Sequence, residues 1–259
     1  MYSVQRQSLV LEILEQDGQV DVSDLAKRFS TSKETIRRDL RSMEKSGLLS
    51  RTHGGAVPIE KAFSQGYEYP LFAREIKKYD EKQRICKAGA MLLEDGDTIF
   101  LDNSSTTMNF LRYVPSDIKI IAITNSIQVL LEAGKLNNSN INVVSLGGVL
   151  NIKNYSVTGM LSNGFSKIFF PDKAIISCRG ITEKSGITDA SFLEAEVKRI
   201  MIDNAKQLIV LADYTKFDSI GTINIGQLAE IDCVVTDSKV DREKLKMFDR
   251  YKARIVIVD

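Results

Sequence analysis

Residues 31–56, TSKETIRRDLRSMEKSGLLSRTHGGA, restrict the fold of this chain more than any other segment. Thr31 and Ser32 offer N-cap oxygens, and Glu34 follows Thr31 by three residues, which is the spacing of a capping box. Apolar residues then recur at helical spacing as one stripe, whereas arginines occupy other faces of the same helix. The pattern predicts a helix with one buried side and arginine rows outside, a shape that fits a DNA major groove.

The residues around this helix predict a complete winged helix-turn-helix domain. Amphipathic patterns indicate a first helix that ends near residue 18 and a short second helix over residues 22–29. A tight turn then leads into the third helix, for which Gly47 is the expected C-cap. Residues 48–56 fit a small β-wing.

Positive charge is concentrated on the third helix and the wing. Residues 27–51 hold eight basic and three acidic residues, a net charge of +5, whereas residues 1–26 carry −4 and the whole chain +1. A basic face on one helix indicates phosphate contacts. The expected DNA-contacting residues are Ser32, Lys33, Thr35, Arg37, Arg38, Arg41, Arg51 and His53. The alternative is an amphipathic helix whose arginines only solvate it, but three helices and a basic turn together favour double-stranded DNA as the partner.

Beyond residue 95, short β-branched runs alternate with helical patterns. The candidate strands lie at residues 98–101, 119–123, 142–146, 174–177, 208–212, 233–236 and 254–258. This alternation predicts an α/β domain with a mainly parallel sheet.

Prolines and glycines interrupt the pattern between the two halves of the chain. We therefore expect the winged helix-turn-helix domain at residues 1–57 and a linker at 58–74. The α/β domain, to which we assign effector sensing and oligomerisation, is expected at 75–259.

Polar clusters follow five of the candidate strands. Ligands bind at the carboxyl ends of strands in open α/β sheets, and the hydroxyls and free N–H groups of the run at 104–107 suit a phosphate. The expected effector-binding residues are Asp102, Ser104, Ser105, Thr106, Thr107, Thr124, Asn125, Gly147, Gly148, Arg179, Gly180, Glu194, Lys198, Asp213 and Lys216. Taken singly, these are an N-cap cluster, a turn and a surface ion pair, but their joint placement favours a sugar-phosphate pocket.

Several other classes of protein are disfavoured. The chain has no apolar run long enough to span a bilayer and no signal-peptide pattern, so we expect a cytoplasmic protein. Cys86, Cys178 and Cys233 are an odd, widely spaced set, which indicates reduced thiols. With one histidine and no close cysteine pair, we expect no metal site and no cofactor.

The N-terminal segment resembles the DNA-binding domain of the DeoR family of bacterial transcription regulators. The resemblance rests on Ser32, the run TIRRDL at 35–40, Gly47, Arg51 and the run HGGA at 53–56. The second domain is similar to the DeoR-type effector domain, which is related in fold to ribose-5-phosphate isomerase, so the resemblance covers nearly the whole chain. It implies a sensor of phosphorylated sugars or related metabolites.

The resemblance extends to most of the expected effector-binding residues. Matching positions are Asp102 with the Ser/Thr loop, Thr124-Asn125, Gly147-Gly148, Gly180-Ile181, Glu194 with Lys198, and Asp213 with Lys216. Two positions depart from the family pattern. Ser104 stands where the loop commonly has glycine, and serine restricts φ and adds bulk. Arg179 occupies a position often filled by a small residue, and it is either an extra anion contact or a surface arginine.

Together these patterns predict a repressor of a carbohydrate-utilisation operon that is relieved by a phosphorylated sugar or sugar acid. A DNA-binding activator is a further alternative, because the sequence does not set the sign of regulation. A different class is an enzyme that isomerises a sugar phosphate, with Asp102, Glu194 or Asp213 as base and Lys198 or Lys216 as an electrostatic aid.

The N-terminal domain argues against the enzyme, so we expect no catalytic residues. We also expect a homo-oligomer, either a dimer or a tetramer, because operators of this kind repeat a half-site.

Overall fold

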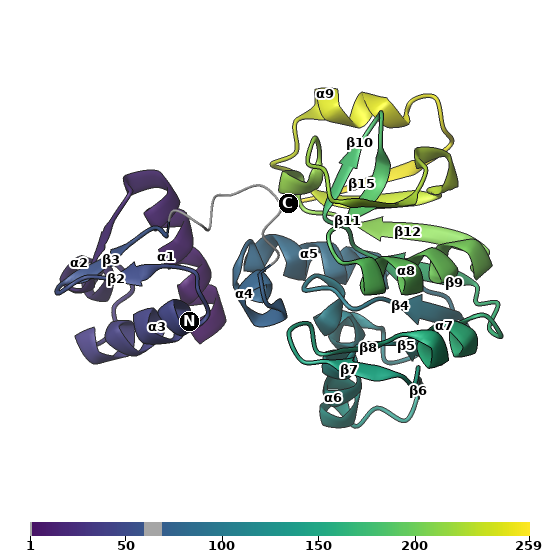
Figure 1. Ribbon diagram of the computed structural model, residues 1–259, viewed down its shortest axis with the longest axis horizontal. Coiled ribbons are helices and arrows are strands. Elements are labelled where there is room, and N and C mark those ends of the chain that lie inside the picture. The colour runs from purple at the N-terminus through teal and green to yellow at the C-terminus, as the bar shows by residue number, and fades with distance from the viewer. Residues whose placement is uncertain (1, 60–68) are drawn as a thin grey trace. The chain divides into compact units, whose positions relative to one another are not determined.

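The computed structural model describes residues 2–59 and 69–259, which divide into two compact units between Asp80 and Glu81 (Figure 1). Of the expected linker at 58–74, residues 60–68 lie outside the described residues. Helix α4 (Leu71–Ile76) belongs to the N-terminal unit, because Ala73 and Ile76 are buried in its core. This unit therefore extends well beyond residue 57.

The N-terminal unit has the winged helix-turn-helix architecture that the sequence predicts. Its other helices are α1 (Ser3–Asp17), α2 (Val22–Arg28) and α3 (Lys33–Lys45). Its antiparallel sheet has the order β1-β3-β2, with β1 (Val20–Asp21), β2 (Ser50–Arg51) and β3 (Gly55–Val57). The apolar stripe of α3 forms the centre of the core, where Ile36, Leu40 and Met43 are almost fully buried.

A glycine ends α3 and starts the wing. Gly47 has a φ of 70° and donates its N–H to Glu44 O at 2.9 Å, while Leu48 N–H donates to Met43 O at 3.0 Å. This pair of hydrogen bonds is a Schellman motif, which needs a residue that tolerates positive φ. The chain turns here and brings β2 beside the C-terminal end of α3.

The second unit is built on a seven-stranded sheet in which every pairing is parallel. Its order is β15-β14-β12-β9-β4-β5-β6. The strands are β4 (Thr98–Leu101), β5 (Ile120–Thr124), β6 (Ile141–Ser145), β9 (Lys173–Ile176), β12 (Gln207–Leu211), β14 (Cys233–Asp237) and β15 (Arg254–Val258). All seven lie within one residue of their predicted bounds, and the predicted fold class is confirmed.

The strand order reverses between β4 and β9. The chain runs outward from β4 through β5 to β6, then returns to β9 on the other side of β4 and runs outward again. A crevice opens at the carboxyl ends of the two strands that flank such a reversal, and this is where open parallel sheets bind ligands.

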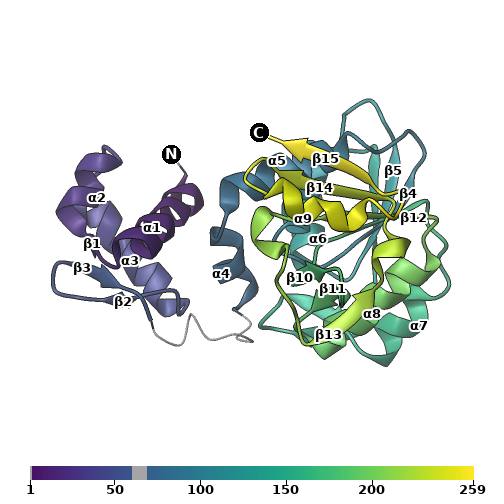
Figure 2. The ribbon, with the colours of Figure 1, turned by 90° about the horizontal axis from the view of Figure 1, so that it is seen from above.

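Helices cover both faces of the sheet (Figure 2). On one face, α8 (Phe192–Asn204) packs on the side of Phe100 and Val210. On the other, α5 (Tyr79–Ala90), α6 (Ile127–Leu136) and the 3-10 helix η2 (Thr107–Tyr113) pack on the side of Ile99 and Ile209. Because both faces are buried, the strands are continuous apolar runs in the sequence.

The remaining elements lie around this sheet. They are the hairpin β7 (Val149–Asn151) and β8 (Ser156–Thr158), a small sheet of β10 (Gly180–Thr182), β11 (Gly186–Asp189) and β13 (Ile223–Gly226), helices α7 (Met160–Ser166) and α9 (Arg242–Leu245), and the 3-10 turns η3 (Tyr214–Lys216), η4 (Leu228–Glu230) and η5 (Lys246–Phe248). None of the helices within the described ranges has the length and apolarity needed to cross a bilayer.

Candidate functional site

Ser32 caps the N-terminus of α3. Its hydroxyl accepts a hydrogen bond from Thr35 N at 3.1 Å and lies 2.9 Å from Thr35 Oγ1. Because the helix begins one residue later than Thr31 would allow, the expected capping box between Thr31 and Glu34 does not form. Either residue offers a hydroxyl, so the sequence alone does not choose between them.

Glu34 instead pairs with two arginines of α3. Its carboxylate lies 2.9 Å from Arg41 Nη2 and 3.6 Å from Arg37 Nη1. The hydrogen bond and charge of Arg41, and then the charge of Arg37, hold the pKa of Glu34 below its ordinary value. Arg38 and Lys33 are exposed and form no ion pair with another described residue. A phosphate therefore competes with Glu34 for two of the arginines and meets Arg38 and Lys33 without competition.

A buried ion pair fixes α3 on α1. Arg6 Nε donates to Asp39 Oδ2 at 2.5 Å and Arg6 Nη2 donates to Asp39 Oδ1 at 3.2 Å, with both side chains almost fully buried. Gln7 adds a third, longer hydrogen bond to Asp39 at 3.4 Å. Sequence reasoning counted Asp39 only as an acid that offsets the basic face. Asp39 lies three residues after Ile36 and four before Met43, so it falls on the buried stripe of the helix, and this spacing could have indicated that Asp39 is buried.

The wing is tied to the end of α3. Arg51 N donates to Glu44 Oε1 at 2.9 Å, and its guanidinium lies 3.8 Å from Glu44 Oε2. His53 is exposed in the turn between β2 and β3. Gly55 has a packing role, since a Cβ at this position would lie 1.7 Å from the carbonyl oxygen of Val20. The predicted β-wing is thus present, with Arg51 held beside the end of α3 and His53 exposed at the tip.

Lys198, on α8, lies at the centre of a buried charge cluster in the second unit. Its ammonium lies 2.9 Å from Asp102 Oδ2 and 2.6 Å from Asp189 Oδ2, and it donates to Ser177 O at 2.8 Å. Burial alone would lower the pKa of Lys198, but the two carboxylates raise it above its ordinary value. The three donors of the ammonium are therefore all engaged by the protein.

Asp102 joins β4 to β9 at the point where the strand order reverses. Besides Lys198, its Oδ2 accepts from Ser177 N at 3.0 Å, and its Oδ1 accepts from Thr107 Oγ1 at 2.7 Å. It is completely buried. The predicted Asp102 and Lys198 thus lie together at the strand ends, but their polar atoms face each other and the hydroxyl loop.

The loop at 104–107 is closed by its own hydroxyls. Ser104 Oγ lies 2.8 Å from Thr107 Oγ1 and accepts from Thr107 N at 3.1 Å. The backbone of Ser104 does not have a positive φ, so serine fits here where the family commonly has glycine. Within the described residues, the N–H groups of Ser105 and Thr106 donate to no acceptor. The loop therefore leaves two consecutive donors for an anion.

Lys82 reaches the same loop from α5. Its ammonium donates to Ser105 Oγ at 3.0 Å, and one turn later Cys86 Sγ lies 2.7 Å from Thr106 O. Lys82 is only 4% exposed. Sequence reasoning missed this residue because a lysine in an amphipathic helix is usually on the solvated face, and only the fold shows that this one faces inward.

Two buried amides and a carboxyl line the strand ends on the other side of the loop. Asn125 Nδ2 donates to Glu194 Oε2 at 3.2 Å, Ser156 Oγ donates to Glu194 Oε1, and Asn103 Nδ2 donates to Asn154 O at 2.9 Å. Burial raises the pKa of Glu194 above its ordinary value, despite the opposing hydrogen bond from Ser156.

The side-chain oxygens of Asn103 and Asn125 are buried and accept no hydrogen bond from the residues the structure describes. Asn125 follows β5 directly and Asn103 lies two residues after β4, and the ends of these paired strands, Leu101 and Thr124, are opposite each other. The hydroxyl of Thr124, by contrast, is already used, because it accepts from Ser126 N at 3.0 Å. Buried acceptors without donors are rare in folded proteins.

Two half-buried cations, Arg179 and Lys216, also lie among the predicted effector-binding residues. Arg179 and Lys216 form no hydrogen bond through their side chains and no ion pair at contact distance with another described residue. Burial raises the pKa of Asp213, but the charges of Lys216 and Lys82 and its hydrogen bonds with Thr215 outweigh this effect and lower the pKa. Asp213 is therefore kept in its carboxylate form by the two nearby lysines.

Two of the three predicted glycines, Gly148 and Gly180, have packing roles, whereas a Cβ on Gly147 would meet no atom within 4 Å. A Cβ on Gly180 would lie 1.9 Å from Ser219 O, and one on Gly148, whose φ is 142°, would lie 2.6 Å from Thr158 O. Gly147 and Gly148 are exposed beyond β6. Across the described part of the chain, no three His, Cys, Asp or Glu side chains gather so as to hold a metal ion.

Comparison with known proteins gives the same two-part division. Residues 6–62 match the DeoR-like helix-turn-helix domain, and residues 77–238 match the DeoR C terminal sensor domain. The chain belongs to the DeoR family. It is 34% identical over 258 residues to the uncharacterised HTH-type transcriptional regulator YulB of Bacillus subtilis (strain 168), with 100% of this chain and 98% of that protein covered.

Other DeoR-type relatives are also named as regulators. The HTH-type transcriptional regulator GolR of Listeria innocua is 30% identical, with 96% of each chain covered, and the glycerol-3-phosphate regulon repressor of Escherichia coli (strain K12) is 27% identical, with 92% of each covered. Among solved structures, ribose 5-phosphate isomerase A of Methanocaldococcus jannaschii is similar at a TM-score of 0.40 and 19% identity, over 54% of this chain and 55% of that one. So distant a likeness says nothing about activity.

Proposed function

We propose that this DeoR-family protein is a cytoplasmic repressor of a carbohydrate-utilisation operon and that a phosphorylated sugar or sugar acid releases it from its operator. The observation that carries the proposal is the pair of unsatisfied amide oxygens, on Asn103 and Asn125, beside a loop with two unused N–H donors. A ligand with hydroxyls at one end and an anionic group at the other would satisfy both: the hydroxyls would donate to the amide oxygens, and the anion would accept from the N–H groups.

The phosphate would bind at the loop. The unused N–H groups of Ser105 and Thr106 would donate to the phosphate oxygens, and the Lys82 ammonium, which is hydrogen-bonded to Ser105, lies beside them. Arg179 and Lys216 supply positive charge from the ends of neighbouring strands. Lys198 contributes indirectly: its donors are occupied, and it holds Asp102 and Asp189 in place.

The sugar would bind toward β5 and α8. The unsatisfied oxygens of Asn103 and Asn125 offer acceptors for its hydroxyls, and Glu194, whose oxygens already accept from Asn125 and Ser156, holds Asn125 in place. An isomerase would need a base that is free to move a proton. The oxygens of Asp102 are engaged by protein donors, and this occupancy favours binding over catalysis.

Helix α5 provides a route by which the ligand would affect DNA binding. It begins at Tyr79 in the N-terminal unit and continues into the sensor unit, so the chain passes between the units through it. A ligand that attracts Lys82 or displaces the Ser105 hydroxyl acts directly on this helix. Release follows if the ligand prefers the arrangement that does not bind DNA.

Mobility shift of the DNA upstream of the gene, with and without a panel of sugar phosphates, tests the proposal. We expect a retarded complex that one phosphorylated sugar dissociates and that the same sugar without phosphate does not. A complex insensitive to every phosphorylated sugar would contradict the effector, and turnover of a sugar phosphate by the protein would support the isomerase. A reporter strain that lacks the gene would settle the sign, with derepression expected.

A further inference from the structure

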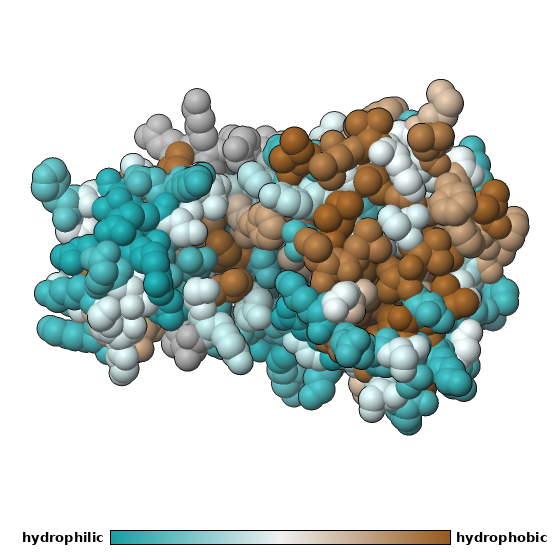
Figure 3. All heavy atoms as spheres, turned by 90° about the horizontal axis from the view of Figure 1, so that it is seen from below, coloured by the Kyte–Doolittle hydropathy of each residue, from teal (hydrophilic) through white to brown (hydrophobic). Residues whose placement is uncertain are grey.

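A broad apolar surface covers part of the sensor unit (Figure 3). Ten large apolar side chains in residues 149–193 each expose 40% or more of their surface. They lie on β7 and the turn after it, on α7 and the segment after it, and at the start of α8. They are Val149, Leu150, Ile152, Met160, Leu161, Phe165, Ile168, Phe170, Phe192 and Leu193. We call this set the α7 surface. A monomeric protein rarely exposes so large an apolar cluster.

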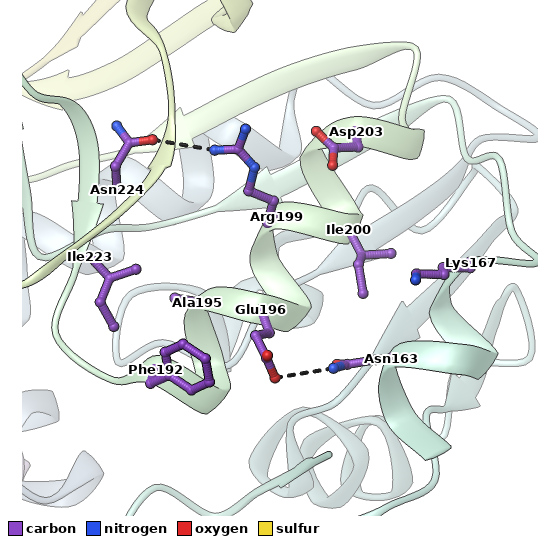
Figure 4. Close-up of a pocket in the computed structure, with 10 residues that line it drawn as sticks. All are labelled: Asn163, Lys167, Phe192, Ala195, Glu196, Arg199, Ile200, Asp203, Ile223 and Asn224. Carbon is purple, nitrogen blue, oxygen red and sulfur yellow. Dashed lines mark hydrogen bonds between the residues drawn. The ribbon is translucent and has the colours of Figure 1, made fainter. Parts of the chain in front are cut away.

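A groove of about 380 Å³ lies between α7 and the outer side of α8, next to these residues (Figure 4). Its walls carry charges of both signs: Lys167 and Arg199 are basic, and Glu196 and Asp203 are acidic. Two hydrogen bonds brace it, from Asn163 Nδ2 to Glu196 at 3.2 Å and from Arg199 Nη1 to Asn224 at 3.3 Å. The Asn163 side-chain oxygen is buried and has no donor among the described residues.

Two of the elements that carry the α7 surface, the β7–β8 hairpin and α8, also line the candidate effector site on their other side. The β7–β8 hairpin exposes Val149 and Leu150, and its buried side carries Ser156, which donates to Glu194. Helix α8 presents Glu194 and Lys198 inward and Glu196 and Arg199 to the groove. A ligand that repositions α8 or this hairpin therefore changes the α7 surface.

We propose that the α7 surface binds the same surface of a second copy of this chain in a two-fold arrangement. Its ten side chains expose on the order of 1,000 Å², comparable to the roughly 800 Å² per partner of a standard interface. Charges of both signs in one groove suit a self-complementary contact, in which the basic groups of one copy face the acidic groups of the other. The inference deepens the proposed function, on which it rests, because the effector then acts on the spacing of two DNA-binding units.

Sedimentation of the full-length protein tests this surface. The variant Leu161→Glu places a charge in the first turn of α7, at a side chain that is 73% exposed and therefore not needed by the fold of the single chain. The matched control is Met91→Glu, which changes a 56% exposed apolar residue of the same unit outside the surface. We expect wild type and Met91→Glu to sediment as dimers or larger, and Leu161→Glu to dissociate at least ten times more readily, with unchanged circular dichroism. A monomeric wild type, or a Leu161→Glu protein that assembles as tightly as Met91→Glu, would overturn the proposal.

Thiol labelling gives a second readout that does not depend on a charge. The native thiols Cys86, Cys178 and Cys233 are buried, so an introduced cysteine reports its own surroundings. Met160→Cys should react with maleimide in dilute solution and become protected as concentration rises, whereas Met91→Cys should react equally at both concentrations. Equal reactivity of Met160→Cys throughout would count against the interface. Neither experiment contains DNA or effector, so these results would stand even if the proposed function were wrong. Failure of the interface in these experiments would likewise leave the proposed function untouched.

Discussion

The ion pair between Arg6 and Asp39 makes a sharp prediction about how the recognition helix is held. Its side chains are 9% and 3% exposed, and two hydrogen bonds of 2.5 and 3.2 Å join them. Removing either side chain breaks a buried ion pair, which destabilises a protein by about 3–5 kcal/mol. Replacing both with apolar residues of similar size removes the two buried charges together, so Arg6→Met with Asp39→Leu should cost less than about 2 kcal/mol.

Hydrogen exchange of peptides from α1 and α3, followed by mass spectrometry of the full-length protein, measures this in the N-terminal unit alone. Each single variant should speed exchange by about 10²- to 4 × 10³-fold, since every 1.4 kcal/mol is a factor of ten. If a single variant unfolds the unit outright, the exchange becomes unprotected, and the double variant should then restore protection. The sensor peptides serve as an internal control and should exchange at the wild-type rate.

The reasoning would be refuted if the double variant exchanged as fast as the faster single variant, because the cost would then come from lost packing around each site. It would also be refuted if Asp39→Leu alone left the exchange of α3 unchanged. Either result would mean that the buried charges are better hydrated than their exposed fractions indicate.

Two further predictions concern the two sites. Arg38→Ala should weaken operator binding, because this exposed cation has no carboxylate partner among the described residues, and if its contact is to phosphate the slope of affinity with salt should fall by ~1; unchanged operator affinity in a filter-binding assay would exclude α3 as the recognition helix. Burial raises the pKa of Glu194, so folding favours the protonated form of this carboxyl group. The protonated carboxyl therefore contributes to the free energy of unfolding below the ordinary pKa of glutamate, and this contribution is lost as the pH rises through the pKa of Glu194 in the folded protein. The melting temperature of Glu194→Gln relative to wild type should therefore rise with pH across this range, and a difference independent of pH would show that Glu194 does not titrate in this way.

The architecture could be read from the sequence because its signals are local. Strands buried on both faces are continuous β-branched runs, and all seven strands of the main sheet stand at their predicted positions. Gly18 and Gly47 mark helix ends through positive φ, and the apolar stripe of α3 identifies its buried side. The positions of the polar clusters at the strand ends follow from the same periodicity.

The roles of individual polar residues could not be read in this way. Asp102 and Lys198 were predicted to face a ligand, yet they bind each other, because a sequence does not show which buried charges satisfy one another. Lys82 reaches Ser105 from a separate helix, and Asp39 meets Arg6 across 33 residues. Gly148 and Gly180 are required by neighbouring backbone that only the tertiary structure brings close.

Reciprocal binding measurements test the central claim, that one chain joins a DNA site to an effector site, most directly. The affinity of the protein for its operator is measured with and without the phosphorylated sugar that dissociates the complex, and calorimetry then gives the affinity for that sugar with and without saturating operator. Because linkage is symmetric, the operator should weaken sugar binding by the same factor by which the sugar weakens operator binding. Sugar binding that is unaffected by operator, in a preparation whose DNA complex the sugar still dissociates, would mean that the sugar acts through another molecule, and would contradict this account.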